Sequence, residues 1–329
     1  MAQALPLDLG ALGPDLDRVE AALLAAVAAD DPFLQQVAQH LIAAGGKRLR
    51  PVLSLASAYV GLEAGASPQV SDDVIQGAVA VELVHLGSLY HDDVMDEAAT
   101  RRGQPTANAR HGNFIAIVAG DYCLARSAQI AARLGTAVAG LLGFTIGRLC
   151  EGQVGELHHL YSPDRPEAAY FASIDGKTAS LMAAACRVGA LTAGLSEPWT
   201  EALTAYGQRI GMVFQIADDV LDVIATDEQL GKPAGNDLLE GVYTLPVLRA
   251  LGDPSVGEEL RAALEAQVDR TGLDRVRKLV RASSGIESAI RVARGIADDA
   301  ERALAPLPRS EAQRELSKLG HVLLDRLAI

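Results

Sequence analysis

Two clusters of aspartate, each spaced Asp-Asp-x-x-Asp, are the residues of this sequence best suited to chemistry. They are Asp92, Asp93 and Asp96 in the first cluster and Asp218, Asp219 and Asp222 in the second. Residues four apart in a helix lie one turn apart on the same face, so Asp92 and Asp96 can reach one ion. Carboxylate oxygens are the ligands that Mg²⁺ prefers, and proteins usually hold Mg²⁺ against substrate phosphates. A single cluster of this kind is also typical of a solvated acidic helix end.

The aspartate spacing occurs twice, and the second cluster begins 126 positions after the first, at Asp218 rather than Asp92. Both clusters follow long apolar runs. Two acidic clusters on solvated faces would only repel each other. Two clusters that face each other across a cavity could bind several Mg²⁺ ions between them. The repetition therefore favours a metal site that two helices share.

Basic residues beside glycines could supply the positive charge that a diphosphate requires. A diphosphate carries about three negative charges, which proteins bind with Lys and Arg. The candidates are Lys47 and Arg50 after Gly45-Gly46, Arg101 and Arg102 before Gly103, Lys177 after Gly176, and Lys232 after Gly231. Glycine lets the backbone approach an anion closely, although each cation alone is also consistent with a solvated surface position. His85, two turns before Asp92, is either a core histidine or a donor to a phosphate oxygen.

The composition restricts the classes of protein to which this chain can belong. Of its 329 residues, 49% are hydrophobic and 4% aromatic, which favours close-packed helices and excludes general disorder. The net charge of −13 argues against a nucleic-acid partner. No segment reaches the roughly twenty apolar residues of a transmembrane helix, and the N-terminus lacks the pattern of a signal peptide. The three cysteines are far apart, as expected of free thiols in a reducing compartment. We therefore expect a cytoplasmic protein without a transmembrane segment.

The elements that must position these groups have helical patterns throughout. Apolar residues recur at steps of three or four, and proline, glycine and serine mark the ends of the runs. The predicted helices cover 14–29, 32–44, 51–60, 72–96, 114–134, 136–160, 166–195 and 197–225, with four shorter helices from 242 to the end. The segments 101–112 and 227–241 are expected to be loops. No linker divides the chain, so residues 1–329 are predicted to form one all-α domain.

Taken together, these motifs resemble those of the trans-isoprenyl diphosphate synthases, the polyprenyl synthetase family. The match runs from about residue 45 to 248, and its motifs fit in order and spacing as a set. They are GGKRLRP at 45–51, ELVH at 82–85, HDDVMD at 91–96, RRGQPT at 101–106, GDY at 120–122, GKT at 176–178, FQIADDVLD at 214–222 and GKPAGNDLLEG at 231–241. The resemblance implies an all-α, single-domain bundle of roughly ten or more helices around a central cavity, the isoprenoid synthase type.

The resemblance also assigns roles to the matching positions. The diphosphate of isopentenyl diphosphate would be bound by Lys47, Arg50, His85 and Arg102. The ligands of Mg²⁺ would be Asp92, Asp96 and Asp218, with Asp93, Asp219 and Asp222 as further ligands or their supports. The allylic diphosphate would be held by Arg101, Lys177 and Lys232, with Thr178 and Gln215 beside the developing carbocation. The catalytic set would be Asp92, Asp93, Asp96, Lys177, Thr178, Gln215 and Asp218. Val242 stands where many relatives have lysine, so one extra phosphate contact is not expected here.

Product length depends on the residues one turn before the first cluster. In the family, an aromatic residue there stops the growing tail at short products. This chain has Gly87 and Ser88, both small, with Val84 next along the helix. We therefore predict a long all-trans product, beyond geranylgeranyl, that serves as a precursor of a quinone side chain. The resemblance further implies a homodimer.

Several alternatives remain open at this point. A geranylgeranyl or farnesyl diphosphate synthase of the same family would differ only in product length. A class I terpene cyclase shares an acidic cluster and Mg²⁺, but it has no use for the second diphosphate site that GGKRLRP and RRG indicate. A non-catalytic partner subunit would not need two intact aspartate clusters.

Overall fold

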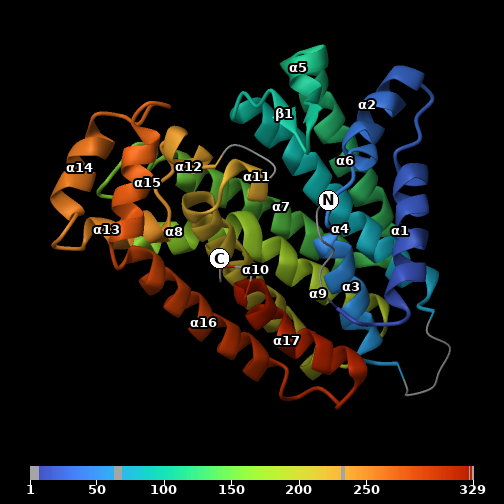
Figure 1. The fold of residues 1–329 in the computed structure, drawn as a ribbon. Coiled ribbons are helices and arrows are strands. Elements are labelled where there is room, and N and C mark those ends of the chain that lie inside the picture. Colours follow the sequence, from blue (N-terminus) through green and yellow to red (C-terminus); the bar gives the residue numbers. More distant parts are fainter. Residues whose placement is uncertain (1–6, 63–68, 231–233, 326, 328–329) are drawn as a thin grey trace. The chain divides into compact units, whose positions relative to one another are not determined.

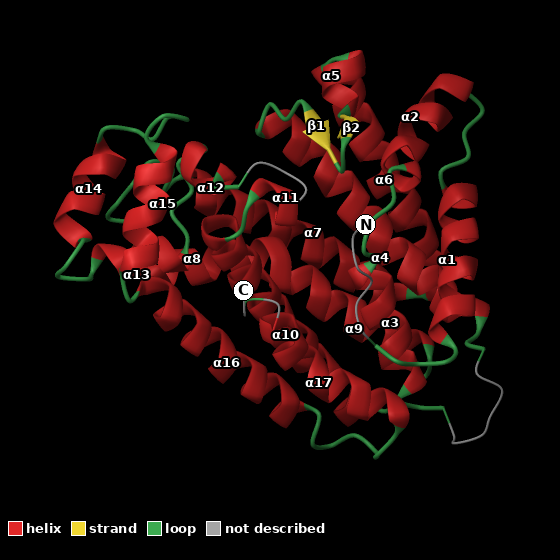
Figure 2. Ribbon diagram, in the orientation of Figure 1, coloured by secondary structure: helices red, strands yellow, loops and turns green. Residues whose placement is uncertain are grey.

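The structure is a computed structural model, and it describes residues 7–62, 69–230, 234–325 and 327. Helices dominate these residues, which confirms the predicted all-α class. Figure 2 shows the two short strands of the described chain, β1 (Thr100–Arg101) and β2 (Gln104–Pro105), which pair in an antiparallel hairpin.

The helices group into two compact units. The first unit consists of Met1–Gly147, Leu181–Gly207 and Ala303–Ser317, and the second of Arg148–Ser180, Gln208–Arg302 and Lys318–Ile329. Helices α7 (Thr136–Leu157), α10 (Glu197–Ile224) and α17 (Glu311–Asp325) have residues in both units. The expectations of one domain over 1–329 and of a central cavity stay predictions.

Helix α4 (Asp72–Met95) is the central helix of the first unit. The other helices of this unit are α1 (Leu12–Ala26), α2 (Pro32–Ala43), α3 (Leu49–Tyr59), α5 (Ala107–His111), α6 (Asn113–Leu134) and α9 (Ser180–Thr192). From Val74 to Tyr90, nearly every side chain of α4 is buried, as expected of a helix that is apolar all round. Helices α1, α3 and α6 pack against it (Figure 1). The helix ends at Met95 with Asp96 as its C-cap, so this packing positions the first acidic cluster.

Helices α4 and α6 cross at a pair of glycines. A Cβ atom on Gly87 would lie 3.0 Å from the carbonyl oxygen of Gly120, and a Cβ atom on Gly120 would lie 2.4 Å from Nε2 of His91. Ser127 of α6 donates a hydrogen bond of 2.8 Å to the carbonyl of Ala80. These contacts fix the register of α4 against α6 because neither glycine has room for a side chain.

The second unit surrounds the end of helix α10. Its other elements are α8 (Glu167–Ile174), the π-helical turn η1 (Asp175–Ala179), α11 (Asp227–Leu230), α12 (Asn236–Leu239), α13 (Leu245–Leu251), α14 (Gly257–Glu265), α15 (Leu273–Ala282) and α16 (Gly285–Ala303). Helices α13, α14 and α15 pack against one another over a core that includes Val223 of α10 (Figure 1). Arg277 and Arg281 of α15 each donate to the carbonyl of Val223, at 3.0 Å. They satisfy carbonyl groups that a helix end leaves without partners, directly after the second acidic cluster.

The structure corrects the predicted elements at four places. The segment 101–112 is not a loop, because it contains the hairpin and α5. The predicted helix 166–195 is α8, η1 and α9, interrupted by the π-helical turn. The segment 227–241 contains the short helices α11 and α12, and five helices rather than four follow residue 242 in the described chain. Elements of four or five residues are too short to show a helical period in the sequence.

Helix α6 is the one helix of the described chain that is long and apolar enough to cross a membrane. Within its most apolar window, 39% of the residues are buried. This finding rests on length and composition alone, and core helices pass the same test, so it is weak support for a membrane span.

Candidate active site

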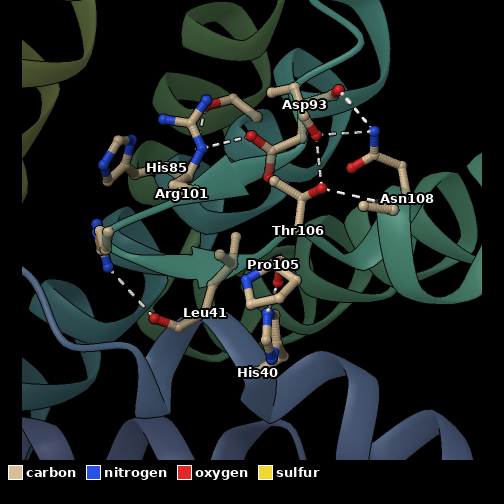
Figure 3. A network of polar contacts seen from close by, with 12 residues as sticks. His40, Leu41, His85, Asp93, Arg101, Pro105, Thr106 and Asn108 are labelled. Carbon is tan, nitrogen blue, oxygen red and sulfur yellow. Dashed lines mark hydrogen bonds and ion pairs between the residues drawn. The ribbon is translucent and has the colours of Figure 1, made fainter. Parts of the chain in front are cut away.

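The three aspartates of the first cluster differ in their surroundings. Asp92 is half-buried and Asp96 is exposed at the end of α4, so both carboxylates can reach solvent or a ligand. Asp93 is buried and pairs with Arg101, whose Nε lies 2.5 Å from its Oδ1 (Figure 3). Asn108 donates to the backbone carbonyl of Asp93 at 3.0 Å. The structure therefore ties Asp93 to the hairpin that follows α4, while its neighbours in the cluster face outward.

The hairpin presents the two predicted arginines through a tight turn. Arg101 pairs with Gln104, so the loop is Arg102-Gly103, and both loop residues have positive φ, 52° and 74°. This is the geometry of a type I′ turn, in which glycine is favoured and arginine is strained. Gly46 makes room for the Arg102 guanidinium, since a Cβ there would lie 2.9 Å from Cζ of Arg102. Arg102 also donates to the carbonyl of Leu41 at 3.2 Å (Figure 3).

Three basic residues in the α2–α3 loop and the first turn of α3 have different surroundings. Lys47 is exposed, whereas Arg48 is buried and bonded to carboxylates of α1 and α4. Arg48 Nη2 donates to Glu20 at 3.0 Å and Nη1 to Glu82 at 3.3 Å. The Nε atom of Arg50 is buried and has no hydrogen-bond partner. Arg48 thus anchors the loop, and Arg50, in the first turn of α3, has an unused donor.

His85 lies on α4, and Figure 3 shows it near Arg101. Desolvation lowers the pKa of His85 well below its ordinary value, and four positive charges lower the pKa further: Arg50, Arg102, Arg101 and Arg48. The imidazole is therefore neutral at pH 7, with one N–H to donate and one nitrogen to accept. A neutral donor surrounded by cations is suited to a phosphate oxygen.

The three residues predicted to control chain length face in different directions. Val84 is fully buried, and Gly87 packs against α6. Ser88 is half-buried, and its Oγ donates to the carbonyl of His85 at 2.8 Å. Of these three residues, Ser88 is therefore the one whose side chain is neither fully buried nor packed against α6.

The second cluster is held by hydrogen bonds inside the second unit. Tyr170 Oη donates to Oδ2 of Asp219 at 2.5 Å, and Gln215 Nε2 donates to its Oδ1 at 2.8 Å. Burial raises the pKa of Asp219 to about 7. Thr178 donates to Oε1 of Gln215 at 2.7 Å, which joins the predicted pair Thr178 and Gln215 to the same network. Sequence reasoning missed Tyr170, whose signal would have been a tyrosine eight residues before the GKT threonine.

Asp218 and Asp222 lie on either side of this network along α10. Asp218 is half-buried, whereas Asp222 is buried and accepts the backbone N–H of Asp237 through Oδ2 at 3.2 Å. The carbonyl of Asp222 accepts the N–H of Gly235 at 2.9 Å. Asp222 thereby holds the start of α12 against α10. Lys232, which sequence reasoning placed nearby, lies outside the described residues.

Lys177 is positioned by the π-helical turn η1. Its Nζ donates to Glu156 of α7 at 2.7 Å, a contact that sequence reasoning did not predict. The backbones of α7 and η1 meet at Gly152 and Gly176, where a Cβ on Gly152 would lie 2.5 Å from the backbone nitrogen of Lys177. Isolated π-helical turns are frequent at functional sites. The turn and the two glycines therefore fix the position of Lys177 relative to α7.

Known proteins match this chain along most of its length. The family model "Polyprenyl synthetase" matches residues 31–282. The chain is 41% identical to heptaprenyl diphosphate synthase component 2 of Geobacillus stearothermophilus over 94% of this chain and 95% of that protein. It is 38% identical to nonaprenyl diphosphate synthase of Mycobacterium tuberculosis over 90% and 88% of the two chains. A crystal structure of geranylgeranyl pyrophosphate synthase from Corynebacterium glutamicum, complexed with calcium and isoprenyl diphosphate, matches with TM-score 0.83 and 36% identity over 96% of each chain.

An all-α fold that carries two aspartate clusters, with a cationic group beside the first, defines a class of enzymes that act on diphosphates through metal ions. The match over 31–282 completes the assignment: the chain belongs to the polyprenyl synthetase family, and it is a prenyltransferase. The resemblance inferred from the motifs is confirmed.

Proposed function

We propose that this protein condenses isopentenyl diphosphate with an allylic prenyl diphosphate, and repeats the step to make a long all-trans polyprenyl diphosphate with Mg²⁺ as its metal. One observation carries the proposal. Four arginines act on His85, on the same helix that bears Asp92 and Asp96. In a protein of net charge −13, such a concentration of cations fits a strongly anionic ligand beside a metal site.

Asp92 and Asp96 fit a Mg²⁺ ion that is shared with a substrate. No group of three acidic, histidine or cysteine side chains within the described residues is close enough to hold a metal by itself. Mg²⁺ commonly takes only one or two carboxylates and completes its shell with water and substrate phosphates. Asp218 would contribute from the second cluster. When bound, the ion supplies positive charge beside the leaving diphosphate.

The basic residues form two sets, one for each diphosphate. Arg50, Arg102 and His85 would hold isopentenyl diphosphate, together with Lys47. Lys177 and Arg101 would hold the allylic diphosphate, with Lys232 as a further contact. Arg101 uses Nε for Asp93, and a guanidinium has five N–H donors, so donors remain for phosphate. Because each diphosphate has its own set of donors, both substrates would bind at once.

The reaction then needs no protein base. The allylic C–O bond breaks and its electron pair leaves with the diphosphate, which the cations stabilise. The double bond of isopentenyl diphosphate supplies the electrons for the new carbon–carbon bond. A proton leaves the adjacent carbon to the departing diphosphate. The hydroxyl of Thr178 and the amide of Gln215, already bonded at 2.7 Å, would lie beside the carbocation as fixed dipoles.

Two observations support a long product. Ser88 is small and half-buried one turn before Asp92, so it leaves space for a growing tail. The two curated relatives compared above are named for heptaprenyl and nonaprenyl products. The similarity to a geranylgeranyl pyrophosphate synthase keeps a shorter product as the second candidate.

We also propose that two copies of this chain form a homodimer. Helix α6 and the start of α7 expose large apolar side chains, with Phe114 77% and Phe144 69% exposed. Large apolar side chains that stay exposed on a folded chain are typical of a protein–protein interface. One relative is named component 2, which makes a different partner subunit the alternative. Light scattering should give the mass of a dimer, and Phe144→Glu should give a monomer.

The cysteines support a cytoplasmic location. Cys123, Cys150 and Cys186 are all free thiols, as is usual in a reducing compartment.

An incubation with labelled isopentenyl diphosphate tests the proposed function. The purified protein is supplied with Mg²⁺ and with geranyl, farnesyl or geranylgeranyl diphosphate, and products are separated by chain length. We expect label in products longer than geranylgeranyl, made by this chain alone. A hydrocarbon released from the allylic substrate alone would indicate a cyclase. If product formed only after a second protein was added, this chain would be a partner subunit.

A further inference from the structure

Glu82 is a buried carboxylate that interacts with several arginine side chains. It lies on α4, three residues before His85, and only 2% of its surface is exposed. Its Oε1 accepts from Arg48 Nη1 at 3.3 Å, whereas its Oε2 is buried and has no hydrogen-bond partner. A buried carboxylate is costly unless nearby charges compensate it.

The compensating charges are the arginines of the proposed isopentenyl diphosphate site. Burial raises the pKa of Glu82, and the charges of Arg50, Arg48 and Arg102 oppose that rise. In return, Glu82 opposes the lowering of the pKa of Arg50, which burial brings to about 10, and acts likewise on Arg102. Glu82 therefore interacts with guanidinium groups from the α2–α3 loop, from the first turn of α3 and from the hairpin.

Glu82 is the strongest acidic neighbour of two of these arginines, Arg50 and Arg102, on which Asp92 and Asp93 respectively also act. Arg48 has a second carboxylate, since Glu20 of α1 accepts from its Nη2 at 3.0 Å. The buried Nε of Arg50 has no hydrogen-bond acceptor among the described residues. The Arg102 guanidinium packs on Gly46 and donates to the carbonyl of Leu41. Like charges at close range repel strongly where water is excluded. Without a central anion, Arg50 and Arg102 would be pushed apart.

A carboxylate inside an anion site lowers the positive potential there, so its presence needs a reason. A fixed negative charge behind the arginines can hold their guanidinium groups in place before the substrate arrives. Binding is then stronger because the order of the side chains is established in advance. The same logic applies to residues that orient the ligands of metal sites.

We propose that Glu82 is a positioning residue that keeps Arg50 and Arg102 assembled for the diphosphate of isopentenyl diphosphate. The inference rests on the proposed function for the identity of the ligand, and on the contacts of the first unit for the arrangement. Glu82 does not touch the reacting atoms, so it acts on substrate binding rather than on bond breaking.

The test uses Glu82→Gln with a matched control. Glutamine keeps the size and one acceptor for Arg48 but removes the charge. Glu20→Gln is the control, since Glu20 binds Arg48, whereas Glu82 is the carboxylate that opposes the lowering of the pKa of both Arg50 and Arg102. Glu82→Asp, which retains the charge, is the second variant. Each folded variant is titrated with inorganic pyrophosphate and with isopentenyl diphosphate by calorimetry, and its kcat and KM are measured.

Glu82→Gln should raise the Kd for both ligands and the KM for isopentenyl diphosphate about tenfold, with kcat changed less than twofold. Glu82→Asp should recover most of the affinity. Glu20→Gln should lower the melting temperature without changing KM. Unchanged or tighter binding by Glu82→Gln, or an equal loss in Glu20→Gln, would refute the positioning role. Wild-type protein that binds pyrophosphate but forms no product would refute the proposed function, while the pyrophosphate titrations would still decide the role of Glu82.

Discussion

The crossing of α7 and η1 predicts that one glycine of α7 cannot be replaced, while its neighbour one turn away can. A Cβ atom on Gly152 would lie 2.5 Å from the backbone nitrogen of Lys177 and 2.8 Å from the carbonyl carbon of Gly176. Both neighbours are backbone atoms, which cannot rotate away. The two segments would have to separate by about 0.9 Å to restore an ordinary contact of 3.4 Å. Lys177 would move with η1.

The matched control is Gly155→Ala, on the same helix. Its Cβ would meet only Oγ of Ser173, at 3.6 Å, an ordinary van der Waals contact. Alanine stabilises a helix by about 0.5–1 kcal/mol relative to glycine, so Gly155→Ala should raise the free energy of unfolding by up to that amount. Overpacking costs about 1–3 kcal/mol, so Gly152→Ala should lower the free energy of unfolding by about 1–2 kcal/mol.

Urea denaturation of the two variants measures the difference, which should be about 1.5–3 kcal/mol. The KM for the allylic diphosphate should rise in Gly152→Ala and stay unchanged in Gly155→Ala, because only the first displaces Lys177. If both variants were equally stable and equally active, the close approach of α7 and η1 would be wrong, and with it the account of how Lys177 is positioned.

Four further variants test other parts of the site. His85→Gln should remove a pH dependence of stability. Because the pKa of wild-type His85 is lowered in the folded state, the free energy of unfolding should decrease as the pH is lowered below 6.5, by up to about 1.4 kcal/mol between pH 7.5 and 5.5 in urea titrations. An equal slope in the variant would contradict this. Ser88→Phe should shorten the products seen by chromatography, and an unchanged distribution would exclude an open tunnel at that level. Tyr170→Phe should lower the unfolding free energy at pH 8 by about 1.5–3 kcal/mol, since it removes the donor to a buried carboxylate; a smaller loss would mean that solvent replaces the hydroxyl. Asp92→Ala should abolish turnover, and retained activity would exclude it as a metal ligand.

The long helices could be predicted from sequence because their apolar period and end signals are local. The prediction for α2 (Pro32–Ala43) differs from the structure by one residue, and α6 and α10 agree as closely. The interruption of 166–195 by η1 could not be predicted, since it depends on the contact with Gly152. Local patterns do not record where two backbones meet.

The acidic and basic motifs of the site were visible in the sequence, but their division of labour was not. The sequence does not distinguish Asp92, Asp93 and Asp96, and only the packing shows that the side chain of Asp93 points inward and pairs with Arg101. Glu82 was missed although it is an acid within an apolar helix, which is the signal that could have revealed it. Glu156 lies on another helix from Lys177, so no spacing connects them. Contacts between distant residues carry this information.

The most direct test of the central claim is a crystal structure with Mg²⁺ and unreactive analogues of both substrates. Metal ions should join Asp92, Asp96 and Asp218 to the allylic diphosphate, while the second diphosphate lies on Arg50 and Arg102. Diphosphates bound away from both aspartate clusters, or clusters found on opposite outer surfaces, would contradict the account.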